Sequence, residues 1–177
     1  MAKMRKFIAY RAMERPYTRV SKYKKKSYIR MTPVRKVVRY DMGTPGNYEY
    51  DVDFVSVASL QIRQEAIESA RQTCLRWLDQ NVIKGAKFHL KIRKYPYHIL
   101  RENPLAAGAG ADRMSTGMQH SWGKPIGIAL QLRKGEKFFT VQVNEQYVDV
   151  AKKALNRAAK KLPCSFHILV NKNIVKK

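Results

Sequence analysis

The sequence predicts an α+β fold in which a mixed β-sheet carries two packed helices. Two segments have the apolar period of amphipathic helices, and five others have the alternation or the β-branched content of strands. The third observation is charge: 36 Lys and Arg residues against 13 Asp and Glu residues give a formal net charge of +23. More than half of that excess lies in residues 1–48, so we expect an extended basic N-terminal arm followed by a globular body at 49–177.

The arm interleaves aromatic residues with its cations. It shows no lasting period beyond a short candidate strand at Val34–Tyr40, and it holds too little apolar surface to fold alone. Turn-forming residues at Asp41–Asn47 mark its boundary with the body. Such a tail could serve only solubility or targeting. Its tyrosines favour RNA, because extended peptides in folded RNA use cations for phosphates and rings for stacking.

The body begins with a strand and an amphipathic helix. Tyr50–Leu60 alternates around β-branched residues, which predicts a strand. Gln64–Gln80 places its apolar residues at helical spacing and charged residues on the opposite face, and Gly85 is expected to end this helix. Ala86–Arg93 then alternates between apolar and polar residues, which predicts a second strand.

A long internal loop follows, from about 95 to 125, because no period of 2 or 3.6 persists there. Beyond it, Ile126–Arg133 and Lys137–Val143 are expected to pair as a hairpin through a Lys-Gly-Glu connection. A second helix at Glu145–Leu162 and a further strand at Ser165–Val170 complete the expected elements.

Part of the loop, Gly108–Pro125, superficially resembles a phosphate-binding loop. A P-loop has four residues between its glycines and a Ser or Thr after its lysine, because that hydroxyl binds magnesium. Here five residues separate Gly117 from Gly123, and Pro125 follows the lysine. Because proline lacks a backbone donor and cannot start the required turn, the spacing argues against a nucleotide site.

Two other interpretations of the loop remain open. Its small residues would let the backbone approach a partner closely, while Arg101, Arg113 and Lys124 contact phosphates and Trp122 stacks on an unpaired base. The same Gly-Ala composition also fits a plain surface loop. A connection of about thirty residues in a compact domain is usually functional or disordered, and we favour a loop that reaches an RNA partner.

The remaining chemistry is limited. His120 or Asp112 could serve an RNA-processing enzyme, but this segment offers no rigid frame for a nucleophile and its base. The four histidines and two cysteines lack metal-ligand spacing, so we expect no metal, no cofactor and no disulfide. No apolar run reaches membrane-spanning length, and no DNA-binding motif is visible, which leaves RNA as the expected polyanion.

Several separated motifs resemble one known family. They are Arg15–Arg19 and Asp41–Gly43 in the arm, Arg93–His98 with Arg101 before the loop, and Ala109–Arg113, Thr116–Met118 and Gly123–Pro125 within it. On these residues the chain resembles the universal sixteen family of large-subunit ribosomal proteins, in the archaeal and eukaryotic branch called ten-e, counterpart of bacterial large-subunit protein sixteen. Because the longer eukaryotic C-terminal tail is missing after Lys177, we expect the archaeal type.

The resemblance implies a fold of the α/β-hammerhead type and a cytoplasmic ribosomal protein without enzymatic activity. Its implied partners are large-subunit ribosomal RNA, tRNA and neighbouring ribosomal proteins, with no membrane. The protein would lie between the peptidyl transferase centre and the base of the central protuberance, shape the aminoacyl-tRNA site, and join the subunit late in assembly.

Two groups of residues are expected to serve this role. The cations expected to bind RNA are Arg5, Lys6, Arg11, Arg15, Arg19, Lys22, Lys24, Lys25, Lys26, Arg30, Arg35, Lys36, Arg93, Arg101, Arg113 and Lys124. The loop residues expected to face tRNA and the catalytic RNA are Gly108, Gly110, Asp112, Arg113, Met114, Thr116, Gly117, Met118 and His120.

Overall fold

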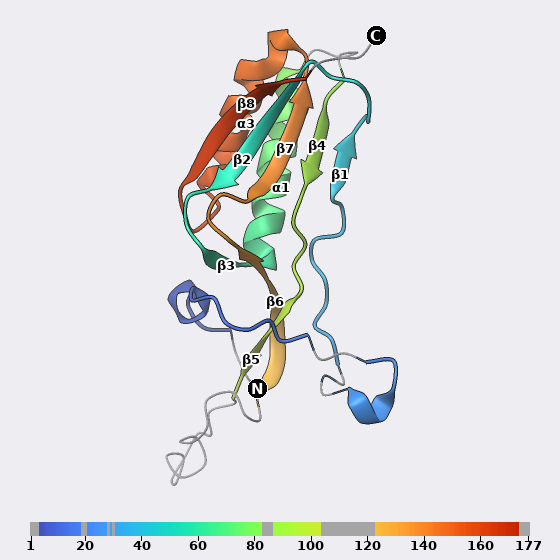
Figure 1. Ribbon diagram of the computed structural model, residues 1–177, viewed down its shortest axis with the longest axis vertical. Helices are drawn as coiled ribbons and strands as arrows, with labels where there is room; N and C mark the ends of the chain where they lie inside the picture. The colour runs from blue at the N-terminus through green and yellow to red at the C-terminus, as the bar shows by residue number, and fades with distance from the viewer. Residues whose placement is uncertain are drawn as a thin grey trace.

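The structure is a computed structural model, and it describes residues 4–18, 21–27, 29, 31–82, 87–103 and 123–173. These residues form an elongated molecule with two β-sheets (Figure 1). A five-stranded sheet with both α-helices on one face occupies one end, and a three-stranded sheet crossed by the N-terminal arm occupies the other. The expected α+β class is confirmed.

The five-stranded sheet has the order β1-β4-β7-β2-β8, and every neighbouring pair is antiparallel. β7 and β8 lie on either side of β2 and therefore run in the same direction, with α3 connecting them across β2. The expected mixed sheet is therefore wrong, because both sheets are antiparallel throughout: the helix between β7 and β8 carries the chain past β2 and does not place two parallel strands side by side. The bounds are β1 Asp41–Gly43, β2 Tyr50–Ser56, β4 His89–Ile92, β7 Lys137–Val143 and β8 Phe166–Lys172.

The three-stranded sheet has the order β3-β6-β5 and is also antiparallel. Its strands are β3 Leu60–Arg63, β5 His98–Glu102 and β6 Lys124–Leu132. The hairpin expected between 126–133 and 137–143 is wrong, because β6 pairs with β3 and β5 whereas β7 pairs with β2 and β4 in the large sheet. The single strand expected from Tyr50 to Leu60 is wrong, because the chain leaves the large sheet after β2 and enters the small sheet at β3. Ser56 stabilises the bend between them, since its Oγ donates to the Ala58 carbonyl oxygen at 2.7 Å.

β5 lies inside the segment expected to be a loop. His98, Ile99, Leu100 and Glu102 are all buried, and burial on both faces removes the alternation that marks a half-buried strand. β6 begins at Lys124, and its Pro125 pairs with Arg101 beside a register shift. An irregular position of this kind tolerates a residue without an N–H. The rest of the expected loop, residues 104–122, lies outside the described residues.

The two helices pack on the same face of the large sheet (Figure 1). α1 spans Gln64–Asn81 and confirms the first expected helix to within one residue; Gly85 lies outside the described residues. The second helix is shorter than expected, with a 3-10 turn η3 at Glu145–Tyr147 followed by α3 at Val148–Ala159. After Ala159 the chain continues in tighter turns, in which the N–H groups of Lys161 and Leu162 donate to the carbonyl oxygens of Ala158 and Ala159. Pro163 follows and disfavours helical backbone at Leu162.

The core lies between these helices and the sheet. Stacked phenylalanine rings fill its sheet side, with centroids of Phe54 and Phe166 4.1 Å apart. On the helix side, Cys74 is fully buried, and burial raises the pKa of its thiol to about 12. This thiol therefore packs as a small apolar group. The other buried apolar residues of the helices are Ile67, Ala70, Leu78, Ala151, Ala154, Leu155 and Ala158.

The face of the large sheet opposite the helices carries a polar network. Asp53 on β2 is fully buried there. Its carboxylate accepts hydrogen bonds from Thr140 Oγ1 at 2.7 Å and Asn171 Nδ2 at 2.9 Å, and Lys137 Nζ lies 2.5 Å from it. The buried charge is therefore neutralised and hydrogen-bonded by side chains of both neighbouring strands, β7 and β8.

The network continues toward the other edge of the sheet. Gln142 Nε2 donates to Asp51 Oδ1 at 2.9 Å, and Gln142 Oε1 lies 2.8 Å from His89 Nδ1. His89 Nε2 in turn lies 3.5 Å from Asp41 Oδ1 on β1. The polar side chains on this face thus bind mainly one another. Among the described residues, no helix is long and apolar enough to span a membrane.

Candidate nucleic-acid interface

The arm binds the small sheet largely through its own backbone. Gln61 on β3 and Gln131 on β6 are buried cross-strand neighbours, and Gln131 Nε2 donates to Gln61 Oε1 at 3.1 Å. Gln61 Nε2 donates to the carbonyl oxygens of Tyr10 at 3.1 Å and Ala12 at 2.5 Å. Gln131 Nε2 donates to the carbonyl oxygen of Glu14 at 2.6 Å. These side-chain amides hold a segment that has little regular structure of its own.

A second contact joins Tyr17 of the arm to β5. Its backbone N–H donates to His98 Nδ1 at 2.8 Å, and its carbonyl oxygen accepts from the Ile99 N–H at 3.0 Å. Because Nδ1 accepts, the neutral ring carries its proton on Nε2. Burial lowers the pKa of His98, Glu14 opposes this shift, and Arg101 adds to it. The docked arm therefore requires the neutral imidazole.

The beginning of the arm contacts a buried carboxylate at the end of β5. Tyr10 OH donates to Glu102 Oε1 at 3.0 Å, and Arg5 Nε lies 3.0 Å from Glu102 Oε2. Burial raises the pKa of Tyr10, which keeps the phenol protonated as a donor. Gly127 on β6 makes room for this segment, because a Cβ there would lie 2.6 Å from Met4 Cε. Arg5, expected to bind RNA, thus has a partner within the protein.

The end of the arm contacts α1 and the large sheet. Gln64 Nε2 donates to the Val34 carbonyl oxygen at 2.9 Å, and Gln64 Oε1 accepts from the Lys36 N–H at 3.1 Å. A side-chain amide thus takes the place of a neighbouring strand, and the strand expected at Val34–Tyr40 is wrong. The strand in this region is β1, where a turn was expected. Gly43, the last residue of β1, has a φ of +83°, which glycine adopts easily. A Cβ at this position would collide with the Phe88 carbonyl oxygen.

This mode of docking leaves most cations of the arm exposed. Lys36 also pairs with Glu65, at 3.1 Å, although its side chain stays 56% exposed. Exposed Arg and Lys side chains are the groups that proteins use to contact phosphates. The exposed cations of the described arm are Arg5, Lys6, Arg11, Arg15, Lys22, Lys25, Lys26, Arg35, Lys36 and Arg39, of which only Arg39 was not expected from the sequence.

The cations expected in the body differ from one another. Lys124 and Arg93 are exposed, and Arg93 Nε also donates to Thr140 Oγ1 at 3.0 Å. Arg101 is half-buried, with its guanidinium 3.7 Å from the centroid of the Tyr17 ring. Arg101 therefore helps to hold the arm against β5, in addition to any contact with RNA.

Several expected site residues cannot be placed in this interface. Arg19, Arg30 and Arg113 lie outside the described residues, as does the side chain of Lys24. The loop residues Gly108, Gly110, Asp112, Met114, Thr116, Gly117, Met118 and His120 also lie outside them.

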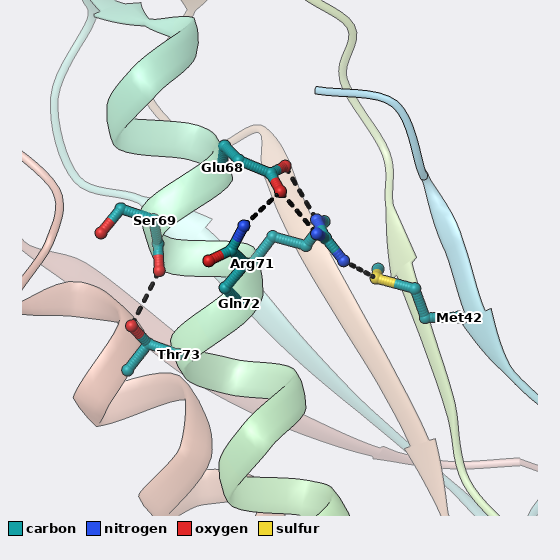
Figure 2. Close-up of polar contacts among 6 residues, drawn as sticks. All are labelled: Met42, Glu68, Ser69, Arg71, Gln72 and Thr73. Atoms are coloured by element: carbon teal, nitrogen blue, oxygen red, sulfur yellow. Dashed lines mark hydrogen bonds and ion pairs between the residues drawn. The ribbon is translucent and has the colours of Figure 1, made fainter. Parts of the chain in front are cut away.

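Arg71 on α1 shows that part of the positive charge is neutralised internally (Figure 2). Its Nε and one Nη donate to the two carboxylate oxygens of Glu68 at 2.9 and 2.5 Å, while the other Nη lies 3.2 Å from Met42 Sδ. The bonds from Arg71 lower the pKa of Glu68. This fork links α1 to β1, so the net charge overstates the charge that is free to meet a partner.

The residues that hold the arm were not recognised from the sequence. Gln61, Gln64, Gln131, His98 and Glu102 are all buried. A signal was present, because Gln131 stands between two leucines in an apolar run, and a polar side chain at such a position needs a hydrogen-bond partner. The identity of that partner, a backbone segment more than a hundred residues away, is set by the fold.

Known proteins can be matched to this sequence over most of its length. The family model described as Ribosomal protein L16p/L10e matches residues 17–169. A protein named large ribosomal subunit protein uL16 from Methanoculleus marisnigri is 43% identical over 148 residues, which cover 83% of this chain and 86% of the relative. Proteins of the same name from Staphylothermus marinus and Caldivirga maquilingensis are 41% and 40% identical, over 87% and 94% of this chain and 85% and 95% of the relatives.

Proposed function

The chain belongs to the ribosomal protein L16p/L10e family, and from that premise we propose that it binds large-subunit ribosomal RNA and helps to shape the aminoacyl-tRNA site. It is of the archaeal and eukaryotic type, as the resemblance implied. As a large-subunit ribosomal protein it has a structural role and is not an enzyme. The expectation of an RNA-processing catalyst at His120 or Asp112 is therefore set aside.

The docking of the arm is the observation that supports RNA binding. Gln61, Gln131 and Gln64 bind backbone atoms of the arm, so most of its lysines and arginines stay exposed. A surface of this charge repels itself unless a polyanion neutralises it. Ribosomal RNA supplies such a polyanion over the whole length of the arm.

The finer assignment concerns tRNA and the catalytic centre. The family resemblance supports it, together with the place from which the long loop leaves the fold. That place is the end of the small sheet, between Glu102 of β5 and Lys124 of β6. Arg5 and Tyr10 of the arm contact Glu102, so the arm binds the end of β5, directly before the remaining part of the expected loop. The same proposal includes contacts with neighbouring ribosomal proteins, addition to the subunit late in assembly, and location in the cytoplasmic ribosome.

Two charge-matched variants test the RNA-binding arm. In one, the exposed arm residues Lys22, Lys25 and Lys26 become glutamine; in the other, the exposed residues Lys153, Lys160 and Lys161 at the opposite end become glutamine. The measurement is the slope of log binding constant against log salt concentration for a large-subunit RNA fragment. Each lost phosphate contact lowers the magnitude of the slope by about 0.7 on single strands and about 0.9 on a duplex.

We expect the arm variant to lower the slope by about 2 to 3 and the control variant to lower it by less than about 1. Equal slopes for the two variants would remove the arm from the interface. Sedimentation of each variant with large subunits in high salt gives a second measurement, because a structural component stays bound in stoichiometric amount.

A further inference from the structure

Three tyrosines surround a hollow between the arm and the body. This tyrosine hollow is defined by Tyr40, Tyr95, Tyr97, Ile99, Ile128 and Arg35, and its volume is about 470 Å³. Pockets that hold small ligands have volumes of about 300–1,000 Å³ and combine apolar or aromatic walls with a few polar groups. The hollow has that size and that lining.

The rings of the hollow are held in place yet remain open to solvent. The ring of Tyr40 meets that of Tyr95 edge-on, with centroids 4.7 Å apart. Tyr97 OH donates to Gln131 Oε1 at 3.3 Å. Even so, Tyr95 is 52% exposed and Tyr97 is 44% exposed. Fixed, exposed rings of this kind are what single-stranded nucleic acids use for base stacking.

The charge around the rings favours an anion. Arg35 is exposed at the hollow, and no acidic side chain is among its described lining residues. A second hollow of about 540 Å³ lies on the other side of Tyr95 and Tyr97 and includes Arg15 and Arg133. Its lining also includes Lys94 and the two carboxylates Glu14 and Glu136, with Glu136 2.8 Å from Lys94, so three cations against two carboxylates leave a positive balance.

We propose that the tyrosine hollow receives unpaired nucleotides of RNA, with bases stacked on Tyr95 and Tyr97 and a phosphate bound by Arg35. The buried Ile99 and Ile128 supply the apolar contact that a base needs when it leaves a helical stack. A duplex cannot use this site, because its bases are already stacked and paired and must be splayed out to meet a protein ring.

The hollow also depends on the arm. Arg35 and Tyr40 come from the arm and its end, whereas Tyr95 and Tyr97 come from the connection between β4 and β5. The site is therefore complete only while the arm is docked. The inference rests on the proposed function for the presence of RNA, and it adds which RNA feature is bound and where.

The full-length chain and short RNA probes test this proposal. The probes are an oligouridine of about 12 nucleotides, within the site sizes of single-strand binders, and a duplex of the same length. The test variant is Tyr95→Ala with Tyr97→Ala, and the matched control is Tyr95→Phe with Tyr97→Phe, which keeps both rings. Thermal unfolding of both variants checks that the fold is retained, and the single variant Tyr97→Ala provides a milder change.

We expect the double alanine variant to bind oligouridine at least about fivefold more weakly, since loss of one stacking ring costs about 1–3 kcal/mol. Its duplex binding should stay within about twofold of the unaltered chain, and the phenylalanine variant should bind both probes normally. Equal weakening of both probes, or weakening of neither, overturns the hollow as a stacking site while leaving the RNA-binding proposal intact. Failure of the unaltered chain to bind either probe would overturn both.

A cross-linking experiment on assembled large subunits identifies the occupant directly. Ribosomal RNA that contains 4-thiouridine should cross-link to the peptide with Tyr95 and Tyr97, and the double alanine variant should lose that cross-link. If a protein-reactive cross-linker instead joins the peptide to a neighbouring ribosomal protein and no RNA cross-link forms, the hollow is a protein contact and the proposal is wrong.

Discussion

Buried polar side chains on the outer face of the five-stranded sheet and those on the small sheet find their hydrogen-bond partners in different parts of the chain. On the large sheet, Asp53 binds Lys137, Thr140 and Asn171, which all belong to neighbouring strands of the same sheet. On the small sheet, Gln61 and Gln131 bind the backbone of a segment far away in sequence. The first network closes within its own sheet, whereas the second recruits another part of the chain.

This difference explains where the free positive charge lies. In the closed network, acidic and basic side chains neutralise one another, so little net charge remains for a partner. In the recruiting network, uncharged amides bind carbonyl oxygens of the arm, and the arm's lysines and arginines stay available. The large sheet thus mainly stabilises the fold, whereas the small sheet binds the backbone of the arm and leaves the arm's cations exposed to a polyanion.

The largest effect should come from opening the closed network with Asp53→Ala. The substitution removes a buried carboxylate with three partners and leaves Thr140 and Asn171 without their acceptor. We expect the free energy of unfolding to fall by about 3 kcal/mol, with RNA affinity of the folded chain nearly unchanged. Urea unfolding measures the first quantity and filter binding at fixed salt the second.

Asp149→Ala is the matched control, because that carboxylate is 83% exposed and pairs with Lys152 on the surface. Exposed pairs of this kind contribute about 0–1 kcal/mol. A similar loss of stability in both variants would mean that the buried network is no more important than a surface pair, and the comparison between the two regions would lose its basis.

A smaller effect is expected from Gln61→Leu, which removes the amide that holds the arm. The carbonyl oxygens of Tyr10 and Ala12 lose their donor, so the arm should detach more often. At a cost of about 1 kcal/mol, tryptic cleavage after Arg11 should become about fivefold faster. Mass spectrometry of timed digests measures this rate.

Gln142→Leu makes the same substitution in the closed network, where it removes the bonds to Asp51 and His89. We expect it to lower global stability without speeding cleavage of the arm. If both glutamine variants release the arm equally, the two regions open together and the arm has no separate docking equilibrium.

The expected elements that lie in the large sheet and its helices agree best with the structure. Their apolar periods come from one buried face, so α1, β7 and the strand at β4 follow from local pattern alone. The errors gather where a segment is buried on two faces or bonded to side chains. β5 has no alternation because the arm covers it, and the 34–40 segment is extended because Gln64 binds it rather than a strand.

The sequence predicts the class of the candidate site, an RNA-binding arm, but not the contacts that hold this arm or pair its cations. Charge and interleaved tyrosines in the amino-acid sequence indicate an RNA-binding arm, and the family comparison agrees with that class of protein. The internal pairing of Arg5 with Glu102 required the fold, since Glu102 is buried by tertiary contacts, whereas Arg71 and Glu68 lie three residues apart on one helix. The juxtaposition of Tyr40 with Tyr95 likewise joins segments more than fifty residues apart.

The smallest effect concerns pH and again separates the two regions. Burial lowers the pKa of His98, whose Nδ1 accepts the Tyr17 N–H that helps to dock the arm. A lowered pKa means that the undocked or unfolded chain binds the proton more readily. The contribution of this histidine is therefore complete above its ordinary value of about 6.5 and is lost as pH falls from there toward the folded pKa.

We expect arm cleavage to speed up between pH 7 and pH 5.5, by an amount that corresponds to at most about 1.4 kcal/mol at one unit below the ordinary value. His98→Asn is the control, because an asparagine Oδ1 can accept the same N–H and does not titrate; its cleavage should vary little over that range. If the asparagine variant keeps the full pH dependence, the response arises from other groups. A flat profile in both proteins would show that protonation of His98 does not open the contact, and that the other bonds, such as those from Gln61 and Gln131, suffice to hold the arm.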